Sequence, residues 1–162
     1  MTVERRGLRL PAHLAGLFDP GSVRAGVLSG ATYPAETLTN AQTGEQHPDP
    51  RAGLPVAAIA ASLEYGEHQN HARPFMHTTV AKQGSTWAAS LVTLLKQGES
   101  AASALGTVGQ TMQGDIQATI HEWPADNAES WAAFKGFNHG LVLTNHLHNS
   151  IKSEVAMRKG AD

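Results

Sequence analysis

Two long helical patterns joined by a very short link constrain this chain more than any other feature of its sequence. Over residues 75–97, apolar side chains recur at the three- and four-residue spacing of an amphipathic helix. The same spacing returns over residues 101–120, and Pro124 closes it. Between them, Gly98 is a helix stop and Ser100 is a suitable N-cap. A link this short allows only an antiparallel helical hairpin.

Three glycines interrupt the second helix of this predicted hairpin, at Gly106, Gly109 and Gly114. Each costs about 1 kcal/mol relative to alanine inside a helix. We therefore expect close backbone packing against the first helix or a sheet, in preference to the alternative of a contact between subunits.

A shorter helix precedes the hairpin. Residues 55–65 are rich in alanine, and Gly66 can take the left-handed conformation that ends a helix. After a polar loop, Pro74 suits the first turn of the next helix, where its missing N–H is no loss. Glu64 and Arg73 flank the loop, and we predict a charge-assisted hydrogen bond between them.

Alternating apolar residues mark one strand near each end of the chain, at residues 23–29 and 151–157. The two strands share the same parity and are predicted to pair. The sequence thus predicts an α+β fold: a small antiparallel sheet, a short Ala-rich helix and a long antiparallel helical hairpin.

The remaining segments divide the chain into three parts. We expect an N-terminal arm at residues 1–21, a single α+β domain at 22–157 and a frayed tail at 158–162. Two stretches of the domain are predicted to be loops, a long polar one at 30–54 and an aromatic one at 126–140.

Composition excludes several classes of protein. The 162 residues are 41% hydrophobic and 16% charged, which indicates a globular chain. A formal net charge of -2 gives no basic footprint for specific recognition of nucleic acid. The absence of cysteine excludes disulfides and thiol chemistry. Residues 1–10 lack the apolar core of a signal peptide, and no apolar run is long enough to cross a membrane.

Nine histidines raise the question of a metal site. Five of them are His68, His71, His77, His146 and His148. The last two would project to the same side of a strand. Zinc needs three or four converging ligands, and this spacing is too loose to specify them. We interpret the histidines as solvated or locally hydrogen-bonded, and predict no cofactor. No Gly-x-Ser-x-Gly elbow occurs either, so we predict no catalytic residue and no enzymatic activity.

Trp131, Phe134 and Phe137 lie in the 126–140 stretch. Aromatic residues in a loop are typical of an interface, although they can equally fill a small core. We regard these three as candidate interface residues. The histidines of the polar loop, His68 and His71, belong to the same group of candidates.

Two groups of residues carry a resemblance to a known family. The first is Glu64-Tyr65-Gly66, followed by Arg73-Pro74-Phe75, and the second is Lys135-Gly136, followed by Thr144-Asn145 and Ser150-Ile151. Together they resemble the tail-completion and neck proteins of long-tailed bacteriophages. Leu143 stands where the family usually has aspartate, and Asn145 where it usually has glycine. The order of the two groups is reversed relative to many members, a variant that we associate with some temperate phages.

The resemblance implies a structural virion protein of the head–tail junction, made in the cytoplasm of the bacterial host. Such a protein would form a ring of six copies. Its partners would be itself and the neighbouring neck, connector and tail-tube proteins, with no membrane contact. Three alternatives stay open: a tail-tube terminator, a small metalloenzyme and a soluble binding module. The metalloenzyme would use His68, His71, His146 and His148.

Overall fold

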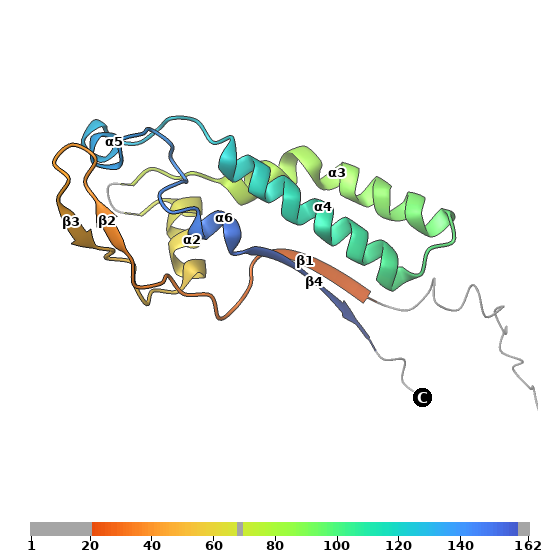
Figure 1. The fold of residues 1–162 in the computed structure, drawn as a ribbon. Helices are drawn as coiled ribbons and strands as arrows, with labels where there is room; N and C mark the ends of the chain where they lie inside the picture. The colour runs from red at the N-terminus through yellow and green to blue at the C-terminus, as the bar shows by residue number, and fades with distance from the viewer. Residues whose placement is uncertain (1–20, 68–69, 159–162) are drawn as a thin grey trace, which may run out of the picture.

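The computed structural model describes residues 21–67 and 70–158, which contain two antiparallel two-stranded sheets and five helices (Figure 1). In chain order the elements are β1 (Gly21–Val27), β2 (Thr37–Thr39), β3 (Gln46–Pro48), α2 (Val56–Tyr65), α3 (Phe75–Lys96), α4 (Ala101–His121), α5 (Glu129–Lys135), α6 (His146–Asn149) and β4 (Ile151–Met157). The predicted α+β class is confirmed. Most of the predicted arm and tail, together with His68, lie outside the described residues.

The helical hairpin is α3 and α4, and one side of α4 packs on the sheet formed by β1 and β4 (Figure 1). The predicted pairing of the two terminal strands is confirmed, with Val23 opposite Val155 in an antiparallel register. Arg24 and Glu154 form an ion pair of 3.0 Å on the outer face of the sheet. β1 ends at Val27, two residues earlier than the apolar alternation predicted.

One of the three helical glycines explains how closely α4 approaches the sheet. A Cβ atom at Gly109 would lie 2.7 Å from Cγ2 of Val23, which is closer than side chains tolerate. No heavy atom lies within 4 Å of the corresponding positions at Gly106 and Gly114. The expected tight packing is therefore confirmed at Gly109, whereas at the other two glycines nothing in the described residues requires it.

The apolar core lies where α2, the start of α3, the end of α4 and the start of β4 meet. Its most deeply buried side chains are Val56, Phe75, Ile116, Ile120 and Ile151. Burying a large apolar side chain contributes about 1.5–3 kcal/mol. Phe75 follows the helix-opening proline directly, so the chain reversal before α3 also positions the centre of the core.

Two segments predicted to be loops contain regular structure. Within residues 30–54, β2 and β3 form a hairpin, and the Asn40 side chain accepts a hydrogen bond of 2.9 Å from the backbone N–H of Gln42 in its turn. Within residues 126–140, α5 forms one short helix that ends at a left-handed Gly136. The all-loop prediction was wrong at both places because elements this short leave too little apolar periodicity to be recognised in the sequence.

The predicted strand around His146 and His148 was also wrong. These residues lie in α6, one turn of helix, and their imidazoles bond to different groups. Nε2 of His146 lies 3.0 Å from the carbonyl oxygen of Thr32, and Nδ1 of His148 lies 3.0 Å from the side chain of Asn149. The strand begins only after this turn.

Candidate functional site

Gly66 ends α2 as predicted. Its φ of 74° lies in the left-handed region that favours glycine. A Cβ atom there would lie 2.9 Å from the backbone nitrogen of Ala72, so the returning chain also leaves no room for a side chain. The Glu-aromatic-Gly group is therefore a backbone reversal, with Tyr65 pointing into solvent at 81% exposure.

The predicted bond between Glu64 and Arg73 was wrong. The Glu64 carboxylate instead accepts hydrogen bonds of 2.9 Å from the backbone N–H groups of Met76 and His77. These are among the first N–H groups of α3, which have no partner inside the helix and lie at its positive end. A carboxylate satisfies both needs, so Glu64 joins the end of α2 to the beginning of α3.

Arg73 pairs with Asp126, which is 53 positions further along the chain. Its Nε lies 3.0 and 2.9 Å from the two carboxylate oxygens, and Nη2 donates to the Asp126 carbonyl oxygen at 3.2 Å. Nε1 of Trp123 and Nε2 of His71 also lie 3.0 Å from this carboxylate. Burial raises the pKa of Asp126, but hydrogen bonds from His71, Arg73 and Trp123 outweigh it and hold the pKa below its ordinary value.

A second ion pair lies within the 30–54 segment. Arg51 donates to Asp49 through Nε at 2.9 Å and through Nη2 at 2.6 Å. Its guanidinium also lies 4.5 Å from the centroid of the Tyr33 ring. The hydrogen bonds from Arg51 hold the pKa of the buried Asp49 carboxyl below its ordinary value, against the effect of burial.

Lys135 is a third cation in the same region. It is 9% exposed, donates to the carbonyl oxygen of His139 at 2.6 Å, and lies 4.6 Å from the centroid of the Phe137 ring. Burial, together with the nearby charges of Arg73 and Arg51, lowers its pKa from 10.5 to about 8. Within the described residues, no carboxylate forms an ion pair with Lys135.

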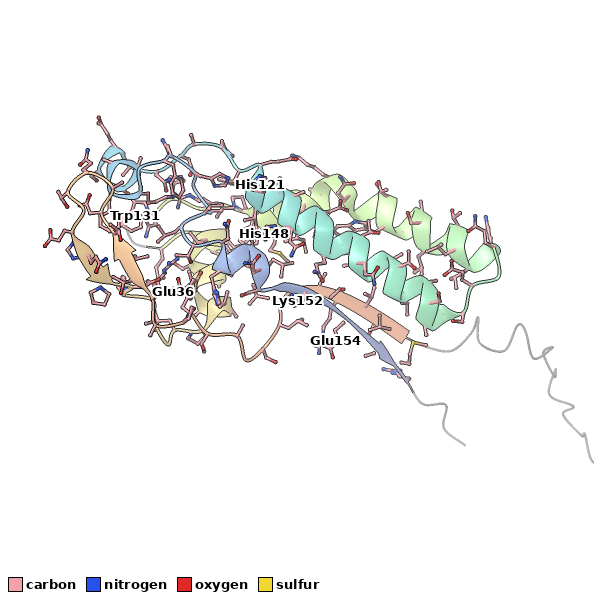
Figure 2. The ribbon with its side chains drawn as sticks, in the orientation of Figure 1. Glu36, His121, Trp131, His148, Lys152 and Glu154 are labelled. Carbon is pink, nitrogen blue, oxygen red and sulfur yellow. The ribbon has the colours of Figure 1, made fainter. Side chains whose placement is uncertain are left out.

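These three cations line one cavity of about 430 Å³, which we call the cationic cavity. Asp49 also lines it, whereas Asp126 holds Arg73 from outside the lining. The apolar part of the wall comes from α2, α5, β2 and the segment before α6. It includes Leu38, Ile59, Leu63, Trp131, Leu141 and Leu143. In Figure 2, Trp131 lies near the left-hand end of the molecule, away from Lys152 and Glu154 on β4.

The three candidate aromatic residues have different roles. Trp131 and Phe134 stack on α5, with ring centroids 5.0 Å apart and planes 4° from parallel. The Phe134 carbonyl accepts a hydrogen bond of 2.8 Å from Ala41, which fixes α5 to the β2–β3 hairpin. Trp131 and Phe137 keep about two-fifths of their surface exposed and remain candidate interface residues.

The second group of family-like residues forms the joint between α6 and β4. Asn145 has a φ of 57°, so it takes the positive φ predicted for the position where the family usually has glycine. The Ser150 hydroxyl donates to the His146 carbonyl at 2.8 Å, and Ile151 enters the core. The hydroxyl of Thr144 is buried and has no hydrogen-bond partner within the described part of the chain.

Compared with protein families, curated proteins and solved structures, this chain matches none. Residues 21–67 and 70–158 contain no group of three His, Asp or Glu side chains placed to hold a metal ion. They also contain no helix with the length and apolar character needed to cross a membrane.

Sequence reasoning named Arg73 and, within the second family-like group, Lys135, but it missed Asp49, Arg51 and Asp126. Asp126 and Lys135 lie far along the chain from Arg51 and Arg73, and nothing in their spacing indicates that they meet. A local signal existed only for Asp49 and Arg51, which are two positions apart and of opposite charge.

Proposed function

We propose that this chain is a non-enzymatic structural protein of the bacteriophage head–tail junction. As a tail-completion or neck component, it would assemble into a ring of six copies that joins the tail to the head connector. Its partners would be further copies of itself and the neighbouring neck, connector and tail-tube proteins. The protein would be made in the host cytoplasm and end in the virion.

One observation carries this proposal: both groups of family-like residues serve as joints of the fold. Glu64 holds the start of α3, Gly66 makes the reversal, and Arg73 clamps the segment at Asp126. Asn145 makes the turn into α6. Glu64 bonds to the protein's own backbone and Arg73 to a charged partner, whereas Gly66 and Asn145 act through their positive φ, which is the behaviour of residues that determine shape.

Exposed apolar side chains supply surfaces for the proposed assembly. Tyr65 and Val80 border a groove of about 420 Å³ between the end of α2 and the start of α3. Trp131 and Phe137 are exposed at the α5 end of the molecule. Large exposed apolar groups of this kind are typical of protein–protein contacts.

The proposal is tested most directly in virus particles. Mass spectrometry of purified virions of the encoding phage should detect the chain, and cryo-electron microscopy should place it between head and tail. Mass photometry of the purified protein should show a species of six chains of 17.1 kDa each, or assembly on addition of neck proteins. Absence of the chain from purified virions would refute the proposal.

A further inference from the structure

The charges around the cationic cavity do not balance. Arg51, Arg73 and Lys135 contribute three positive charges, whereas the carboxylates of Asp49 and Asp126 pair with the two arginines. Lys135, the third cation, forms no ion pair with a carboxylate among the described residues, although the charge of Asp126 acts on it from a distance. Burying an unpaired charge costs free energy, so the unpaired ammonium group of Lys135 indicates that the cavity accepts an anion.

The geometry of Lys135 leaves room for such a partner. An ammonium group has three N–H donors. One of them donates to the His139 carbonyl, and the Phe137 ring lies on another side of the group. Each of the two arginines is bonded to its own carboxylate. Their positive charges still attract an anion in the cavity, while Lys135 keeps N–H donors for it.

We propose that the cationic cavity binds one carboxylate group carried on an apolar body. The carboxylate would accept hydrogen bonds from Nζ of Lys135, in the field of Arg51 and Arg73. The body would lie against the wall formed by Leu38, Trp131 and their apolar neighbours. A cavity of about 430 Å³ is large enough for a phenylalkyl group or for two side chains of a peptide.

The excess charge also indicates which anions fit poorly. A phosphate group at neutral pH carries nearly two negative charges and strong acceptors on all sides. Asp49 lines the cavity and Asp126 lies behind Arg73, so the second negative charge would meet repulsion. A carboxylate matches the single unpaired charge.

The binding should depend on pH. Burial, Arg73 and Arg51 lower the pKa of Lys135 to about 8, while Asp126 opposes them. Between pH 7 and 9.5 the ammonium group of the free protein loses its proton, so carboxylate affinity falls over this range. A bound carboxylate favours the charged form, so the fall is displaced to higher pH when the ligand is present.

The test compares a carboxylic acid with its uncharged counterpart. Isothermal titration of the full chain with 4-phenylbutyrate at pH 7 should detect binding, and 4-phenylbutanol should bind at least about tenfold more weakly, the loss of one charge-assisted hydrogen bond. Equal binding of the acid and the alcohol would overturn the proposal. So would the absence of binding by both small probes and by the peptide named below. These measurements use only the wild-type protein.

Substitution then identifies the anchor. Lys135→Met keeps the apolar stem and should weaken 4-phenylbutyrate binding by about tenfold or more, and it should abolish the pH dependence. Lys152→Met, at an exposed position on β4, is the matched control and should change affinity by less than about twofold. A Lys135→Met variant that is folded by circular dichroism and binds normally would contradict the assignment.

The source of the carboxylate is decided by a second pair of probes. Acetyl-Leu-Glu-Phe-amide should bind, and its Glu→Gln analogue should not, if the ligand is a segment of a neighbouring protein. Binding of 4-phenylbutyrate alone would point to a free small molecule. Neither result depends on ring assembly, so this proposal and the proposed head–tail function succeed or fail separately.

Discussion

The two ends of the molecule are held together by different physics. At one end α3, α4, β1 and β4 form what we call the body, in which α4 packs against α3 and against both strands (Figure 1). At the other end, the distal end, the β2–β3 hairpin, α5 and residues 136–143 are held by the ion pair between Arg73 and Asp126 and by backbone hydrogen bonds. Apolar contacts repeat along a chain and leave a pattern, whereas a polar clamp depends on single pairs of residues.

The largest effect should come from the core that the body shares with α2. Phe75→Ala removes a fully buried side chain and should lower the free energy of unfolding by about 3–5 kcal/mol, through lost transfer energy and a residual cavity. Chemical denaturation measures this. Phe137→Ala, at a position 41% exposed in the distal end, is the control and should cost less than about 1 kcal/mol. A similar loss of unfolding free energy in both variants would contradict the difference between the body and the distal end.

The next largest effect tests the polar clamp. Arg73→Met leaves the half-buried Asp126 carboxylate without its arginine partner and should cost about 2 kcal/mol. Because the clamp joins the distal end only, hydrogen exchange should accelerate over residues 126–143 while α4 keeps its protection. Uniform acceleration across α4 would show that the distal end does not open independently.

A double-mutant cycle separates the observed pairing from the predicted one. Arg73→Met and Asp126→Asn should be non-additive, because they share one interaction. Arg73→Met and Glu64→Gln should add within about 0.5 kcal/mol, because Glu64 bonds to the start of α3 instead. Coupling between Glu64 and Arg73 above that range would restore the pairing expected from the sequence.

The body could be predicted from sequence because each of its elements has a local signature. Residues 75–97 and 101–120 carry helical periodicity, and the observed helices agree with these bounds to within one residue. Gly66 and Asn145 also had local signatures, since few residues adopt positive φ without strain. Pairing of the terminal strands followed from their shared parity.

The distal end could not be predicted because its specificity is not local. Arg73 had two plausible carboxylate partners, and sequence proximity favoured the wrong one, Glu64. Glu64 bonds instead to backbone N–H groups at the N-terminus of α3, where a carboxylate is stabilised, so it does not pair with Arg73. The tertiary fold alone brings Lys135 to the cationic cavity and Asp126 to Arg73, so no sequence spacing indicates either position.

A smaller effect tests how tightly the body is packed. Gly109→Ala would place a methyl group 2.7 Å from Val23 and should cost about 1–3 kcal/mol through overpacking, offset in part by helix propensity. Gly106→Ala and Gly114→Ala meet no atom within 4 Å and should stabilise the chain by about 0.5–1 kcal/mol each. Thermal unfolding of the three variants would measure this, and a stabilising Gly109→Ala would contradict the close approach of α4 to β1.

Another small effect should have the opposite sign to that of the core substitution Phe75→Ala. Lys135→Met replaces a buried, unpaired cation by an apolar side chain and should raise the free energy of unfolding at pH 7 by about 1 kcal/mol, after the lost bond to His139 is counted. The pKa of Lys135 is lowered to about 8, so the cost of its charge is fully present below pH 8. It is relieved as the pH rises toward 10.5, the ordinary value.

The stabilising effect of Lys135→Met should therefore shrink between pH 8 and pH 10, as urea unfolding at each pH would measure. Lys152→Met is the matched control, because that side chain lies on an exposed position of β4 and should show no such trend. A pH-independent or destabilising Lys135→Met would mean that the ammonium group is well satisfied in the free protein. The expected sign would mean that the distal end keeps a charge at the expense of its own stability, which a protein tolerates where that charge is needed for binding.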